Sequence, residues 1–161
     1  MKYIITATKS EAQAFVDKFK LSKEKSNSEI TLIVSGIGVE NMFKKTSQIV
    51  TLMDKTDTLL NIGICGASSK FEIGELLNID INTKSVGKYN LTCCENEVYQ
   101  KDKYDIVDME SSGFIEASNQ VENRYIFKVV SDNFAPETVT KEKTKKLIYD
   151  KIDEIMQKVS Q

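Results

Sequence analysis

Three acidic residues lie where a carboxylate could act as an acid or a base. Glu11 is at the start of a predicted helix after the first strand. Glu110 directly follows a predicted strand at 104–109, and Asp132 follows one at 124–130. Because ligands of open α/β sheets bind outside the carboxyl ends of the strands, we expect these carboxylates to converge on one rim. There they could exchange protons with a ligand.

The amino-acid composition limits which side chains can act as an acid or a base. The chain has no histidine, so a general acid or base should be a carboxylate, lysine, tyrosine or cysteine. Its one arginine, Arg124, cannot form an arginine clamp around a phosphate. The cysteines are odd in number and two are adjacent, which is not the pattern of a disulfide framework. Without histidine or a CxxC pair, neither a zinc site nor a cofactor is expected.

Each carboxylate also has a purely structural interpretation. Glu11 fits a capping box with Thr8, which by itself accounts for a glutamate there. Glu110 would complement the positive end of a helix dipole, and Asp132 lies in a Ser-Asp-Asn turn sequence. Taken singly, these interpretations are at least as good as catalytic ones. Only the coincidence of the three suggests a site.

Glycine turns follow two other predicted strands. The segment 36–38 (GIG) opens a helix whose free N–H groups could hold an anion, but it lacks the third glycine of a dinucleotide fingerprint and the lysine of a P-loop. The segment 63–66 (GICG) would let a ligand approach the backbone. A tight turn explains each of them equally well. Cys65 is expected to be a small buried residue, because no histidine is present to activate it.

Hydrophobic patterns predict strands that alternate with helices. Strands are expected at 2–6, 29–35, 58–62, 75–81, 104–109 and 124–130, with a less regular one at 89–94. Helices should begin near Thr8, Gly38 and Glu110, and a single last helix should follow Pro136 with its apolar face between 147 and 159. Such alternation implies a mainly parallel sheet. For the polar stretch 82–103, a short hairpin and a simple loop both remain open.

Length and charge limit the class of protein further. A chain of 161 residues suits a single domain over 1–161. The net charge of -2 leaves no basic surplus for nucleic acid. No apolar run approaches the roughly 20 residues that span a bilayer, and the N-terminus lacks a signal-peptide layout. The sequence therefore predicts a cytoplasmic domain without nucleic-acid or membrane partners.

Five segments together resemble the purine nucleoside and uridine phosphorylase superfamily, most closely the methylthioadenosine/S-adenosylhomocysteine nucleosidases. They are 3–11 (YIITATKSE), 34–38 (VSGIG), 61–67 (NIGICGA), 107–111 (VDMES) and 129–132 (VVSD). The pair VDMES and VSD is the most specific part. The resemblance implies an α/β three-layer sandwich with a mixed, mainly parallel central sheet, shortened between residues 77 and 107.

The family cleaves N-ribosidic bonds of nucleosides through a transition state in which positive charge develops on the ribose. By resemblance, Glu11 would orient the attacking water and Asp132 would donate a proton to the purine. Glu110 would bind the ribose hydroxyls. The substrate-binding residues would be Ile64, Gly66, Met109 and Glu110.

Three functions remain open on the sequence. The leading hypothesis is hydrolysis of a purine nucleoside or a methylthioadenosine-like nucleoside. The alternatives are a non-catalytic member that binds a nucleoside or a partner protein, and a phosphorylase that holds phosphate on the N–H groups of 36–38 with a lysine. Arg124 lies at the end of its strand opposite Asp132, which favours water over phosphate. A homodimer is a further expectation, because a truncated sheet edge invites pairing.

Overall fold

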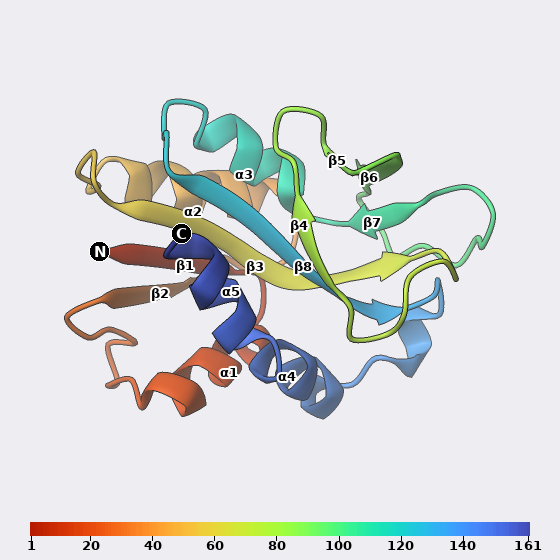
Figure 1. Cartoon of the computed structure of the whole chain (residues 1–161), viewed down its shortest axis with the longest axis horizontal. Helices are drawn as coiled ribbons and strands as arrows, with labels where there is room; N and C mark the ends of the chain where they lie inside the picture. Colours follow the sequence, from red (N-terminus) through yellow and green to blue (C-terminus); the bar gives the residue numbers. More distant parts are fainter.

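The computed structural model describes residues 1–161 as a curled β-sheet with helices on both faces (Figure 1). The strands are β1 (Lys2–Thr6), β2 (Ile30–Val34), β3 (Thr58–Ala67), β4 (Leu76–Ile79), β5 (Ser85–Val86), β6 (Tyr89–Cys93), β7 (Ile106–Asp108) and β8 (Arg124–Asp132). The helices are α1 (Lys9–Phe19), α2 (Val39–Val50), α3 (Ser111–Ala117), α4 (Lys141–Tyr149) and α5 (Ile152–Val159), with a short 3-10 turn η1 (Pro136–Thr138).

The sheet is mixed and mainly parallel, as predicted. β1 pairs in parallel with β2 and β3, and β8 pairs in parallel with β3 on its other side. β4 pairs antiparallel with β8. At the carboxyl end of β3, β7 pairs antiparallel with it and carries β6 alongside in parallel. The end of β3 is therefore held between β7 and β8, which places the residues that follow these strands close together.

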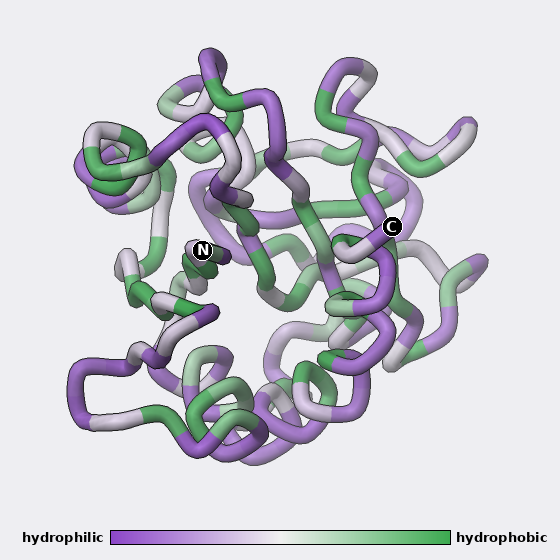
Figure 2. The backbone as a smooth tube through the Cα atoms, turned by 60° about the vertical axis from the view of Figure 1, so that its left-hand side comes forward, coloured by the Kyte–Doolittle hydropathy of each residue, from purple (hydrophilic) through white to green (hydrophobic).

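Two apolar clusters fill the space between the sheet and the helices. One packs α1, α4 and α5 against one face and includes Phe15, Phe127 and Ile155, all fully buried. The other packs α2 and α3 against the opposite face through Met42 and Phe114. Figure 2 shows the hydrophobic residues concentrated along the central strands, while the outer loops are hydrophilic. This three-layer α/β arrangement confirms the predicted fold class.

Several element boundaries differ from the sequence prediction. β3 and β8 continue to Ala67 and Asp132, because the two strands remain paired beyond the expected ends. The prediction of a single last helix was wrong: the chain forms α4 and then α5. Lys151 donates its N–H to the carbonyl of Ile148, a tightened last turn that separates the two helices. Both helices then bury their apolar residues in the same cluster.

The stretch 82–103 begins with a short hairpin, one of the two alternatives left open by the sequence. β5 and β6 pair antiparallel through Val86 and Tyr89. Residues 94–103 then form an irregular segment that leads to β7. No helix of the structure has the length and apolar character needed to cross a membrane.

Candidate active site

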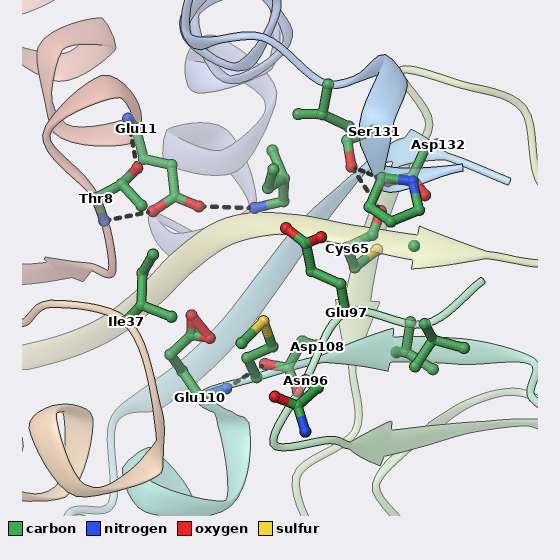
Figure 3. A pocket seen from close by; sticks show the side chains of 17 residues that line it. Thr8, Glu11, Ile37, Cys65, Asn96, Glu97, Asp108, Glu110, Ser131 and Asp132 are labelled. Atoms are coloured by element: carbon green, nitrogen blue, oxygen red, sulfur yellow. Dashed lines mark hydrogen bonds between the residues drawn. The ribbon is translucent and has the colours of Figure 1, made fainter. Parts of the chain in front are cut away.

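A cavity of about 180 Å³ opens where β3, β7 and β8 end (Figure 3). Residues that follow β1 and β2 complete its wall. All residues that the sequence singled out for the site line this one cavity: Glu11, Ile64, Gly66, Met109, Glu110 and Asp132. The fold therefore brings together carboxylates from distant parts of the chain on one rim, as the strand ends predicted.

Glu11 forms the capping box with Thr8 and also makes a contact that a cap does not require. Its Oε2 accepts hydrogen bonds from the backbone N–H groups of Ala7 and Thr8, both at 2.9 Å. Its Oε1 accepts one from the N–H of Ile64 on β3, at 3.1 Å. A carboxylate has about four lone-pair sites, so one acceptor site on Oε1 remains free. The side chain is thus fixed and can still accept a hydrogen bond from a ligand.

Asp132 is positioned by an irregularity in the sheet. The register between β3 and β8 shifts between Cys65 and Gly66, so that Gly66 pairs with Asp132. Such a bulge re-aims the side chains that follow it. Asp132 Oδ1 accepts a hydrogen bond from Ser131 Oγ at 2.7 Å, and Oδ2 accepts one from the Ala135 N–H at 2.9 Å. Asp132 therefore shapes the turn and also faces the cavity.

Neighbouring side chains leave little room for a side chain at Gly66. A Cβ on Gly66 would lie 3.1 Å from Val107 Cγ2 and 3.5 Å from Asp132 Oδ2. Its neighbour Cys65 is buried, as predicted, and burial raises the pKa of its thiol well above the usual range. That thiol is unsuited to nucleophilic attack.

In the segment Asp108-Met109-Glu110-Ser111, the first three residues line the cavity, and Asp108 also has a structural role. Asp108 accepts hydrogen bonds from the Ser111 N–H at 2.9 Å and the Ser111 Oγ at 2.6 Å, and so anchors the start of α3. Glu110 makes no side-chain cap of α3. The dipole interpretation of Glu110 is thus weakened, because Asp108 holds that helix terminus.

Glu110 is a carboxyl group whose pKa lies near neutral pH. Only 8% of the surface of Glu110 is exposed to solvent. Burial, above all, raises the pKa of Glu110 to about 7, with Asp108 and Glu11 adding to the rise and Lys128 opposing it. A carboxyl group of this kind exchanges its proton near neutral pH, the range in which a general acid or base is most effective.

Lys128 is a buried charge that the sequence prediction of the site did not include. It lies in the middle of β8, and its Nζ forms an ion pair with Asp108 Oδ2 at 3.0 Å. Burial lowers the pKa of Lys128, but Asp108, Glu110 and Glu11 together raise it above its usual value. The one signal in the sequence was a charged residue inside the apolar strand RYIFKVV.

The irregular segment after β6 also contributes to the cavity, which the sequence did not indicate. Asn96, Glu97 and Val98 line it, and Figure 3 shows the Glu97 side chain pointing into it. Glu97 Oε2 accepts a hydrogen bond from the exposed Tyr99 hydroxyl at 3.1 Å. The carboxylates on the wall are Glu11, Glu97, Asp108, Glu110 and Asp132, and no lysine or arginine lines the cavity.

This charge distribution limits what the cavity can bind. A strongly acidic wall without a facing cation suits a neutral or cationic ligand and repels a phosphate. Arg124 lies at the opposite end of β8 and donates to the Ile115 carbonyl at 2.8 Å. No group of three or more histidine, cysteine, aspartate or glutamate side chains is arranged to hold a metal ion.

Known structures share this architecture. A 5'-methylthioadenosine/S-adenosylhomocysteine nucleosidase from Campylobacter jejuni aligns with a TM-score of 0.74 at 14% identity, covering 97% of this chain and 96% of that one. The corresponding nucleosidase from Colwellia psychrerythraea, in complex with adenine, gives 0.70 at 14% identity, covering 98% and 93%. A futalosine hydrolase from Helicobacter pylori gives 0.68 at 15% identity, covering 95% and 97%.

No family model matches the chain, and neither does any curated protein sequence. The similarity is therefore carried by the structure. The chain has the nucleoside phosphorylase-like fold, the fold implied by the five resembling segments. At this level of identity the likeness defines the fold, and the activity must be argued from the site.

Proposed function

We propose that the chain hydrolyses the N-ribosidic bond of a purine nucleoside or a methylthioadenosine-like nucleoside. The observation that carries the proposal is the meeting of Glu11, Glu110 and Asp132 on one cavity. Proteins with the same fold include nucleosidases and a complex with adenine. An acidic wall also stabilises the positive charge that develops on the ribose as the bond breaks.

The residues divide the reaction between them. Asp132, in its protonated form, donates a proton to the purine, and the electron pair of the broken bond leaves with the base. A water molecule held by the free acceptor site of Glu11 attacks the anomeric carbon and gives its proton to that carboxylate. Glu110 accepts hydrogen bonds from the ribose hydroxyls. Proton transfer of this kind contributes about 10²–10⁴-fold to a rate.

Water is favoured over phosphate as the nucleophile because the cavity has no cation to hold a phosphate. The charged side chains on the wall are all carboxylates, and the ammonium of Lys128 is buried against Asp108. The segment 36–38 lines the cavity only through Ile37, with no lysine beside it. Hydrolysis should therefore proceed equally well with and without phosphate.

A second candidate is a non-catalytic nucleoside-binding protein, which one observation favours. Three backbone N–H groups already occupy most of the acceptor sites of Glu11. Such bonding is also what a purely structural glutamate would show. If binding is the function, the cavity should hold methylthioadenosine without releasing adenine.

Adenine release from methylthioadenosine, together with calorimetric binding, separates these functions. The hydrolase should release adenine, and Asp132→Asn should abolish release while it leaves binding and unfolding unchanged. Glu137→Gln, the same carboxyl-to-amide change at an exposed residue that does not line the cavity, should retain release. An unchanged rate in Asp132→Asn would remove Asp132 from the acid role, and binding without release by the natural chain would favour the second candidate.

A further inference from the structure

Lys128 is a buried cation that the proposed reaction does not use directly. Its side chain is 3% exposed and that of its partner Asp108 is 1% exposed. Lysine is almost never buried so completely without a partner. Lys128 does not line the cavity, so it has no contact with a substrate there. Its effect on the site must pass through the groups around it.

Those groups are carboxylates from three different elements. Gly63 of β3 pairs with Lys128, and a Cβ on Gly63 would lie 3.5 Å from Lys128 Nζ and 3.0 Å from Glu11 Oε1. The Lys128 ammonium and the Glu11 carboxylate therefore both lie over Gly63, in space that the Cβ of any other residue would crowd. Asp108 approaches from β7, with its Oδ2 3.0 Å from Lys128 Nζ. The same Oδ2 accepts a hydrogen bond from the Glu110 N–H at 3.4 Å, which places Glu110 directly beside the ion pair.

One cation cannot neutralise three buried carboxylates. If all were ionised, the cluster would hold two uncompensated negative charges, which is costly away from water. Asp108 is stabilised as an anion by Lys128 and by Ser111, and Glu11 by three backbone N–H groups. Glu110 is the member that most readily accepts a proton. Glu97 and Asp132, on the same cavity, add negative charge and favour the same distribution.

We propose that Lys128 is a positioning residue that acts through Glu110, because its ammonium group decides which of the buried carboxylates is ionised when a nucleoside binds. The inference rests on the proposed N-ribosidic hydrolysis. Lys128 pairs with Asp108 and opposes the effect of burial on Glu110, so that Glu110 exchanges its proton near neutral pH. Removal of the cation leaves Glu110 protonated, so that it no longer accepts hydrogen bonds from both ribose hydroxyls.

The test is a titration of the Glu110 carboxyl carbon by NMR in the natural chain, in Lys128→Met and in Lys128→Arg. Loss of the cation should move the Glu110 midpoint upward by about one pH unit or more, whereas Lys128→Arg should stay near the natural midpoint. Adenine release at neutral pH should fall about fivefold for the first pH unit of displacement and about tenfold for each further unit, and it should recover as the pH is raised. A structural role alone would not produce this recovery.

An unchanged or lowered Glu110 midpoint in Lys128→Met would overturn the proposal. If Lys128→Met does not fold, the double variant Lys128→Met/Asp108→Asn is compared with Asp108→Asn alone, so that the two proteins differ only in the cation. A higher Glu110 midpoint in the double variant supports the role of Lys128, and an equal or lower midpoint contradicts it. If the natural chain releases no adenine, the proposed hydrolysis fails, while the titration still decides whether Lys128 controls Glu110.

Discussion

Glu110→Gln should stabilise the folded chain at alkaline pH and have little effect at acid pH. Burial is the main reason that the pKa of Glu110 rises from an ordinary 4.5 to about 7. The difference between these pKa values corresponds to about 3 kcal/mol, at 1.36 kcal/mol for each pH unit. Because the folded chain binds this proton more tightly than the unfolded chain, stability is lost as the pH rises through that window. Glutamine is neutral throughout and removes the loss.

Urea unfolding of both proteins at about pH 5 and about pH 8 measures this effect. The advantage of Glu110→Gln should grow by most of those 3 kcal/mol between the two conditions. Glu40→Gln is the matched control, because Glu40 is exposed on α2 and should show no such growth. Parallel pH dependences of Glu110→Gln and the natural chain would refute the claim that Glu110 is held close to neutrality.

Three further predictions concern the scaffold. Gly113→Ala should lower the free energy of unfolding in urea by about 3 kcal/mol, because the new Cβ would collide with the backbone carbonyl oxygen of Val39 in α2. Gly87→Ala, at an open position with positive φ, is the control and should cost about 1 kcal/mol. Equal losses in the two variants would contradict this packing. Thr8→Ala should cost about 1 kcal/mol by removing the α1 cap, and an unchanged urea midpoint would argue against the cap. Cys65 should resist a thiol reagent in the folded chain while the other two cysteines react; prompt reaction of all three would contradict its burial.

The predictable part of the site came from the ends of regular strands. Glu11, Glu110 and Asp132 each follow a strand with a clear hydrophobic pattern, so their common rim follows from the order of strands and helices alone. The division of labour within 108–111 does not. Asp108 and Glu110 are both acidic residues near one strand end, and both line the cavity. Only the hydrogen bonds and the ion pair to Lys128 show that Asp108 also anchors α3.

The contribution of Glu97 was unpredictable for a different reason. Residues 94–103 are polar and have no helical or strand period, so the sequence carries no signal for where such a segment lies. Lys128 was hidden inside an apolar strand, where one charged residue does not change the strand assignment. The break between α4 and α5 occurs without proline or glycine, and the packing of Ile148, Ile152 and Ile155 in one cluster accompanies it.

The most direct test of the proposed function is the release of adenine from methylthioadenosine by the purified chain, followed by chromatography with and without inorganic phosphate. We predict release at the same rate in both conditions, with free methylthioribose as the sugar product, and none from Asp132→Asn. Release that requires phosphate, with a sugar phosphate as product, would contradict hydrolysis. No release in either condition, even at high protein concentration, would contradict catalysis at this site altogether.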